Sequence, residues 1–238
     1  MSFSKNNSLE IVTLGEKRGL PIIILQDIFT GLDFSDLSDL FQNYFQIHHC
    51  KLKLRKEHFK HQIRGPINQI QDIIFEIQSI IKTKAVLLTG GFTSIFLFEF
   101  ARQNPNKVKA LISLSPPPKS TETFFPYSTY IKILAKNSIC LPELYSFFAL
   151  EKINFMKRFF KYQKLVYSQK LYTKTYLMYE KKKTGLLNPS EIDEIFKNYR
   201  VIKFDTPPDT CFKEKRFKKV LYSVFKEETK LNPKRIIL

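Results

Sequence analysis

The stretch from Lys84 to Pro118 constrains the fold of this chain more than any other part of the sequence. It begins with a short apolar run, Ala85 to Leu88, whose lack of any period predicts a strand buried on both faces of a parallel sheet. Residues 89–91 interrupt the run, and the dense apolar residues from Thr93 onward predict a helix. Val108–Leu114 predicts the next strand, so the order is strand, sharp turn, helix, strand.

This order resembles the nucleophile elbow of the α/β-hydrolase family, in which a G-x-S-x-G motif occupies a strained turn between strand and helix. Ala101, Pro105 and Val108 match the end of the family's helix and the start of its next strand. Counting back from them places Gly91 at the nucleophile position. The resemblance therefore implies the fold but argues against its usual chemistry, because glycine tolerates the turn and carries no nucleophile.

The hydroxyls around Gly91 do not replace the missing serine in this alignment. Thr89 and Thr93 take the positions of the two motif glycines. Thr93 and Ser94 stand at the start of the helix, where a hydroxyl typically caps the helix or bonds locally. They are the alternative candidates for a non-standard nucleophile.

Upstream of the elbow, strands and helices alternate as in a parallel sheet with helices on both faces. Isoleucines from Ile67 to Ile81 recur at three- and four-residue spacing, as on one face of a helix. The resemblance to the family covers roughly residues 8–118. The expected elements are strands at Ile11–Leu14, Pro21–Leu25 and Tyr44–Cys50, a helix through Leu37 and Phe41, and a helix that begins at Pro66.

The oxyanion-hole positions also depart from the family pattern. The family usually carries His-Gly after the first strong strand, and amides of that loop and of the residue after the nucleophile form the hole. This chain has Gln26 and Asp27 in the loop and Phe92 after the nucleophile position. A carboxylate at Asp27 would repel a developing oxyanion. A solvated loop residue or a helix cap is the other interpretation of Asp27.

The late part of the chain lacks the family's histidine. Tyr199–Phe204 predicts a late strand, and Asp205 follows it where the family often has its catalytic acid. In one alignment Arg235–Leu238 starts the last strand. In the other, Val201–Phe204 is the last strand and Thr210 takes the histidine position. In both, no histidine remains as general base, because the family's order is nucleophile, acid, histidine. The histidines that precede the elbow are His48, His49, His58 and His61.

The expected fold class is α/β: an α/β-hydrolase-like, mostly parallel sheet with helices on both faces and a helical cap insertion. The sequence does not decide between a native and a truncated C-terminus. Prolines 116–118 mark the start of the insertion, whose helix-like stretches include Tyr172 and Tyr176. One such helix is expected to end at Lys181–Gly185. A further helix is expected from about Phe212 to Glu228. The predicted parts are an N-terminal core (1–118), a basic and aromatic cap-like insertion (119–197) and a C-terminal core (198–238).

The net charge of +17 is unevenly distributed along the chain. Residues 119–238 hold 25 Lys and Arg against 12 Asp and Glu, whereas residues 1–118 hold 14 against 10. This excess favours an anionic partner through residues 119–238, which the sequence leaves open between nucleic acid, a membrane surface and an acidic protein. A solvated lysine-rich face over inward-packed aromatic residues explains the same pattern. A protein partner or a homo-oligomer also stays open.

The remaining signals argue against cofactors and membrane insertion. Three scattered cysteines, Cys50, Cys140 and Cys211, form neither a disulfide framework nor a metal motif. His48 and His49 would point to opposite faces of a strand, so we expect no metal and no cofactor. No apolar run reaches the roughly 18 residues of a membrane span, and the N-terminus has no signal-peptide core. We expect a cytoplasmic protein without a transmembrane segment.

Three departures from the family pattern, at Gly91, at Gln26-Asp27 and at the late histidine, predict an inactive hydrolase retained for binding, or a decayed ester or thioester hydrolase. The alternative is an active hydrolase with non-standard catalytic residues drawn from Ser94, Thr93 and Asp205. A basic module that binds nucleic acid or an acidic partner is the third hypothesis.

Overall fold

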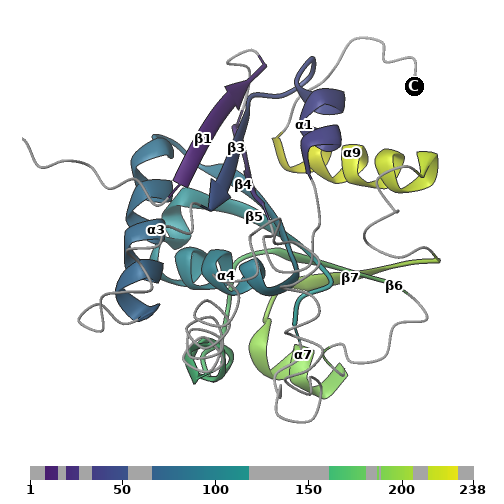
Figure 1. Ribbon diagram of the computed structural model, residues 1–238. Coiled ribbons are helices and arrows are strands. Elements are labelled where there is room, and N and C mark those ends of the chain that lie inside the picture. The colour runs from purple at the N-terminus through teal and green to yellow at the C-terminus, as the bar shows by residue number, and fades with distance from the viewer. Residues whose placement is uncertain are drawn as a thin grey trace, which may run out of the picture.

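A computed structural model describes residues 9–15, 20–26, 34–52, 66–117, 161–180, 187, 189–205 and 214–229. These residues form a seven-stranded sheet with the order β1-β3-β2-β4-β5-β6-β7 (Figure 1). β1 is antiparallel to β3, and all other neighbouring strands are parallel. The strands are β1 (Leu9–Leu14), β2 (Ile22–Leu25), β3 (Ile47–Leu52), β4 (Ala85–Gly90), β5 (Val108–Leu114), β6 (Thr175–Glu180) and β7 (Tyr199–Phe204). The helices are α1 (Ser35–Phe41), α3 (Pro66–Ile80), η1 (Gly91–Thr93), α4 (Ser94–Gln103), η2 (Pro105–Lys107), α7 (Pro189–Ile195) and α9 (Lys215–Thr229), and residues 161–167 are also helical.

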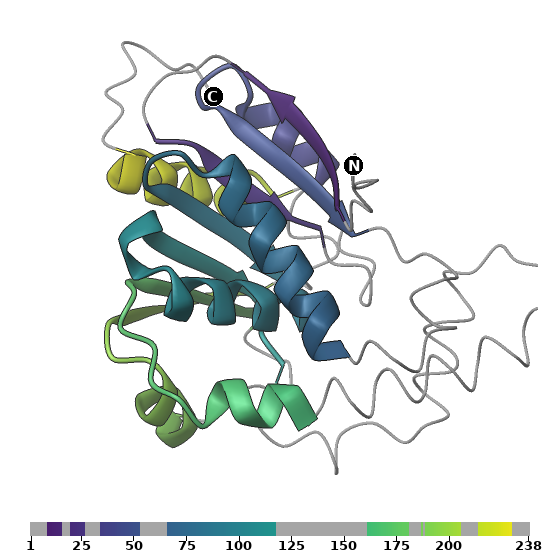
Figure 2. The same cartoon turned by 90° about the vertical axis from the view of Figure 1, so that its left-hand side faces the viewer.

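The sheet divides the buried side chains into two cores, because successive residues of a strand point to opposite faces. Along β4, Leu87 belongs to the core beneath α3 and α4, and Leu88 belongs to the core beneath α1 and α9. Figure 2 shows α3 and α4 together on one face of the sheet. A strand covered on both faces is apolar at every position, which explains the run without a period in the sequence.

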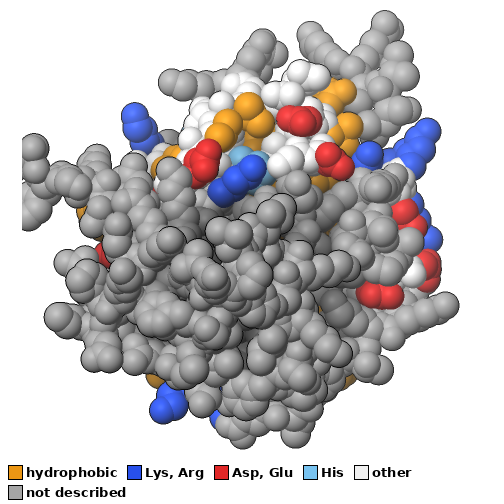
Figure 3. Space-filling model, in the orientation of Figure 1, with side chains coloured by type: hydrophobic (Ala, Val, Ile, Leu, Met, Phe, Trp, Pro, Cys, Tyr) orange, Lys and Arg blue, Asp and Glu red, His pale blue; other side chains and the backbone are white. Residues whose placement is uncertain are grey.

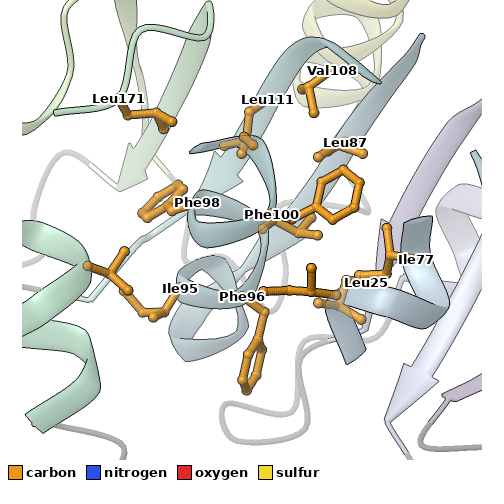
Figure 4. Packing of buried hydrophobic residues seen from close by; sticks show 14 of the residues in the cluster. Leu25, Ile77, Leu87, Ile95, Phe96, Phe98, Phe100, Val108, Leu111 and Leu171 are labelled. Carbon is orange, nitrogen blue, oxygen red and sulfur yellow. The ribbon is translucent and has the colours of Figure 1, made fainter. Parts of the chain in front are cut away.

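Large aromatic side chains join helix α4 to segments of the chain outside the sheet. Figure 4 shows Phe98 and Phe100 pointing to opposite sides of the helix. The ring of Phe98 lies 5.2 Å from the ring of Phe196 and 6.1 Å from that of Tyr167. These contacts pack α4, the helix that follows the elbow, against the segments around Tyr167 and Phe196.

An aromatic cluster joins α1 and α9 on the opposite face. The ring of Phe225 lies 5.4 Å from Phe41 and 5.6 Å from Phe45, in edge-to-face geometry. The ring of Tyr222 stacks on Phe41 at 6.1 Å. Such pairs add to the burial free energy of the rings, so they hold α9 against α1 and the turn that follows it.

Most of the predicted core elements are confirmed, including the strands at β1, β2, β4, β5 and β7 and the helices α1, α3, α4 and α9. The predicted strand Tyr44–Cys50 begins too early. The N–H groups of Tyr44 and Phe45 donate to the carbonyl of Phe41, at 2.9 and 3.0 Å, so both residues close the turn after α1. β3 therefore starts only at Ile47.

One strand falls where the sequence favoured a helix. Tyr176 lies in β6, which pairs with β5 on one side and β7 on the other. Every residue of β6 except Glu180 is buried, so its aromatic side chains fill the two cores. Residues 119–160 and Lys181–Gly185 lie outside the described residues, as do Thr210 and the strand predicted at 235–238. The three-part division of the chain stays a prediction.

The surface mixes apolar and charged groups. Figure 3 shows hydrophobic side chains among acidic and basic ones over β1, β3 and α1. Two of the exposed apolar residues are Ile11 (38%) and Val12 (43%) on the edge strand β1. Cys50 is buried and forms no disulfide. Within the described ranges, no helix is both long and apolar enough to cross a bilayer.

Candidate functional site

The elbow lies at the carboxyl end of β4, where the chain enters η1 and then α4. Gly91 has a φ of 52°, in the left-handed region that favours glycine. The backbone thus keeps the conformation expected at this turn, although the residue has no side chain. The backbone of Phe92, the residue proposed for the oxyanion hole, lies in η1.

Two threonines close the inner side of the elbow. Their hydroxyl oxygens, Thr89 Oγ1 and Thr93 Oγ1, lie 2.9 Å apart, and Thr93 Oγ1 donates to the carbonyl of Gly90 at 2.7 Å. Both side chains are fully buried. The Thr93 side chain bonds within the turn and does not cap α4. Its role in this geometry is therefore to stabilise the turn.

Ser94 is also engaged in a buried hydrogen bond. Its Oγ lies 2.7 Å from Ser113 Oγ, and neither side chain is exposed. The bond joins the first residue of α4 to β5. A hydroxyl in this position connects helix and sheet.

Ser115 is a residue that the sequence did not single out. It follows β5 directly, has a φ of 47° and is 8% exposed. Its hydroxyl has no hydrogen-bond partner among the described residues, whereas its N–H donates to the Met178 carbonyl at 2.7 Å. Pro116 favours extended geometry for the residue before it, so the sequence gives no signal for this left-handed conformation.

Gln26 connects three elements at the carboxyl end of β2. Its Oε1 accepts from His49 Nε2 at 2.8 Å and from the N–H of Phe34 at 3.2 Å. The other ring nitrogen, His49 Nδ1, lies 3.3 Å from Ser38 Oγ. Gln26 therefore ties β3 and the start of α1 to β2. Asp27 lies outside the described residues.

Both histidines among the described residues lie on β3, and β2 stands between that strand and the elbow strand β4. His49 of β3 pairs with Ile24 of β2, and β2 pairs with β4 on its other side. The backbones of β3 and β4 are therefore two strand spacings apart, about 10 Å. His48 bonds with Thr13 Oγ1 at 2.9 Å, and burial lowers the pKa of its ring. The two histidines thus have different partners, and no group of metal-ligating side chains occurs among the described residues. His58 and His61 lie outside those residues.

Asp205 lies at the exposed end of β7. Its carboxylate is 61% exposed and lies 3.9 Å from Arg216 Nη1. β5 and β6 separate β7 from β4, a distance of three strand spacings or about 14 Å. The sequence predicts only one strand, Val108–Leu114, between the elbow and the strand that ends at Phe204. The structure adds β6 between them, so Asp205 follows the third strand after the elbow and not the second. This order favours the alignment in which β7 is the last strand. Glu180, at the end of β6, is one strand closer to Gly91.

The fold can be compared with known sequences and with solved structures. No family model matches the sequence, and no curated protein matches it. The fold is similar to that of MGS-MChE2, an α/β-hydrolase enzyme from a sediment metagenome of the Mar Chica lagoon in Morocco, with a TM-score of 0.66, 14% identity and coverage of 94% of this chain and 97% of that one. The chain therefore has the α/β-hydrolase fold.

Two further neighbours agree on the fold. A serine-to-alanine mutant of CumD, a meta-cleavage product hydrolase from Pseudomonas fluorescens IP01 complexed with acetates, has a TM-score of 0.61 and 12% identity over 92% of this chain and 94% of that one. A carboxylesterase structure from the thaumarchaeon Nitrososphaera gargenis has a TM-score of 0.60 and 17% identity over 95% and 98%.

Proposed function

We propose that this chain is an α/β-hydrolase-fold protein without hydrolase activity, a pseudoenzyme or decayed ester or thioester hydrolase that acts by binding. The observation that carries the proposal is Gly91. Its left-handed φ of 52° preserves the elbow, and its lack of a side chain removes the nucleophile.

Acyl transfer at a serine needs a hydroxyl, a base within hydrogen-bond reach and an acid that orients the base. The hydroxyls nearest in sequence to Gly91 are buried: Thr89 and Thr93 bond to each other, Thr93 also bonds to backbone, and Ser94 bonds to Ser113. Among the described histidines, His49 is the buried one, and both its ring nitrogens have partners away from β4. These contacts support a site that binds without turnover.

An active enzyme with a non-standard set is the alternative. It would require Ser94 or Thr93 to act with Asp205. The Ser94 hydroxyl lies against Ser113, and β5 and β6 stand between the elbow strand and Asp205. This geometry disfavours the alternative. A serine-directed fluorophosphonate that labels Ser94 would restore it.

The test of the proposal is a hydrolase assay on the purified chain. Short-chain p-nitrophenyl esters and thioesters are the first substrates, because a structural neighbour is a carboxylesterase. We expect no turnover above the protein-free rate, with an active esterase as the positive control. Turnover in the wild type that is lost in Asp205→Ala contradicts the proposal.

The second candidate, a basic module for nucleic acid, rests on α9. Four of its first five residues are cationic: Lys215, Arg216, Lys218 and Lys219. Cations at a helix N-terminus oppose the helix dipole, and Lys215 and Lys219 repel each other one turn apart. A polyanion would relieve both effects.

A labelled single-stranded oligonucleotide tests this candidate by fluorescence anisotropy at low and high salt. Salt-sensitive binding that Lys215→Glu/Lys219→Glu abolishes supports it. Lys226→Glu is the matched control, since Lys226 is exposed in the last turn of the same helix. The absence of binding even at low salt removes the candidate.

A further inference from the structure

Ser115 carries two energetic costs that the other hydroxyls near the elbow avoid. A left-handed backbone is unfavourable for a residue with a side chain, and its φ is 47°. A buried hydroxyl without a hydrogen-bond partner is also unfavourable, and Ser115 Oγ has none among the described residues. Strained and unsatisfied residues concentrate at binding and catalytic sites, so Ser115 requires an explanation.

The position of Ser115 relates it directly to the elbow. Gly90 pairs with Leu114 across β4 and β5, so Gly91 and Ser115 leave the sheet side by side, one strand spacing apart, about 4.8 Å. Both have left-handed backbones. Ligands of parallel α/β sheets bind at the carboxyl ends of the strands, which is where both residues stand.

We propose that Ser115 is a ligand-contacting residue, whose hydroxyl donates a hydrogen bond to a carbonyl or carboxylate oxygen of a small ligand held at the carboxyl ends of β4 and β5. The inference rests on the proposed function of binding without turnover. A bonded ligand oxygen satisfies the buried hydroxyl, and the backbone bond from Ser115 N–H to Met178 keeps the residue in place.

The start of α4 supports an oxygen ligand. No side chain caps this helix, although Thr93 and Ser94 stand at its start. The first N–H groups of a helix favour negative or partly negative oxygens, and a helix that follows a strand presents them at the carboxyl edge of the sheet. Ser115 and the helix start therefore offer donors at the same edge.

Two probes separate the forms of this ligand. Butyrate presents a charged carboxylate, and butyramide presents a neutral carbonyl of the same length. Binding is measured by NMR titration of the purified chain. Preference for butyrate identifies a carboxylate ligand, and equal or better binding of butyramide identifies a neutral carbonyl. Either result is consistent with a Ser115 contact if the variants below respond.

The variants are Ser115→Ala and Ser115→Gly, with Ser79→Ala as the control, because Ser79 is an exposed serine of α3. Loss of one hydrogen bond weakens binding by about fivefold or more, and we expect this in both Ser115 variants. Glycine accepts the left-handed backbone, so Ser115→Gly remains folded. Ser79→Ala removes only a hydrogen bond to the Glu76 carbonyl on the surface of α3, so it leaves probe affinity unchanged.

Unchanged affinity in both Ser115 variants overturns the inference, as does a wild-type chain that binds neither probe. An ester-hydrolysis assay on the same samples separates this result from the proposed function. Turnover that falls in Ser115→Ala contradicts the absence of activity but keeps Ser115 in the site. Turnover together with unchanged probe affinity in both Ser115 variants overturns both.

Discussion

Ser94 Oγ of α4 and Ser113 Oγ of β5 lie 2.7 Å apart in the interior of the protein. The pair explains why the start of α4 has no hydroxyl available at the elbow. Each serine satisfies the other, so the hydrogen bond stabilises the packing of α4 on the sheet.

Removal of one partner should cost more than removal of both. Ser94→Ala or Ser113→Ala leaves a buried hydroxyl unpaired and should lower the free energy of unfolding by about 1–3 kcal/mol. The double variant should lose less than either single variant, because no hydroxyl is left unsatisfied. Urea denaturation measures all three. Additive losses would show that the two hydroxyls do not interact.

Glu227 and Glu228, neighbouring residues at the end of α9, differ in how far their carboxylates are buried. Lys174 Nζ lies 2.6 Å from Glu228 Oε1 and 2.9 Å from Glu227 Oε1, and Tyr176 OH donates to Glu228 Oε1 at 2.5 Å. The side chain of Glu228 is 3% exposed and that of Glu227 is 52% exposed. Glu228 therefore joins α9 to β6, whereas Glu227 stands in solvent.

This difference in burial predicts how much stability is lost when each glutamate is replaced by alanine. Glu228→Ala removes the closer acceptor of the buried Tyr176 hydroxyl and leaves only the 3.3 Å contact to Glu227 Oε1. It should lower the free energy of unfolding by about 1–3 kcal/mol. Glu227→Ala should change it by less than about 0.5 kcal/mol, as is usual for exposed ion pairs. Thermal and urea unfolding of the two variants test the contrast. Equal losses of stability in the two variants would contradict the role of Glu228 as the carboxylate that joins α9 to β6.

The same contacts make stability sensitive to high pH. Burial, with the hydrogen bond to Glu228, raises the pKa of Tyr176 to about 12. A raised pKa favours the protonated form in the folded state, so this stabilisation is complete below the unfolded pKa of about 10 and is lost as the pH rises towards 12. Tyr176→Phe should therefore show a shallower loss of stability between about pH 9 and 11. An unchanged slope would exclude Tyr176 as the source.

The elbow could be predicted from sequence because its signals are local. A strand buried on both faces, a glycine turn and an apolar helix each leave their own pattern, and β4, η1 and α4 follow that pattern. β6 was missed because a short buried strand rich in aromatics resembles a buried helix in composition, and only its neighbours β5 and β7 decide between them.

The hydrogen-bond partners of the site could not be predicted in this way. Gln26 bonds to His49, 23 residues away in sequence, and Ser94 bonds to Ser113, 19 residues away. Such pairs depend on how strands and helices meet in three dimensions. The conformation of Ser115 was hidden for a further reason, because Pro116 disposes the preceding residue towards extended geometry.

Gly15 should tolerate substitution poorly although it lies far from the elbow in sequence. It has a φ of 77°, and a Cβ atom there would lie 2.2 Å from the carbonyl oxygen of Phe45 and 2.3 Å from that of Gln42. Both obstacles are backbone atoms of the turn after α1, so Gly15→Ala should cost about 3 kcal/mol or more through strain and overlap. Urea denaturation measures it, and a loss within about 0.5 kcal/mol would show that the turn can move.

Gly91→Ser restores a hydroxyl at the elbow but should not restore hydrolysis. A serine nucleophile needs a base in hydrogen-bond reach, and the described histidines lie away from β4. The left-handed φ of 52° should make Gly91→Ser and Gly91→Ala each less stable by about 1–2 kcal/mol. Comparison of the two variants in ester hydrolysis isolates the hydroxyl, since both carry the same backbone strain. Turnover in Gly91→Ser alone would mean that a base reaches the elbow and that only the nucleophile has been lost. Equal inactivity would mean that the site lacks more than one catalytic group, which is the expected result.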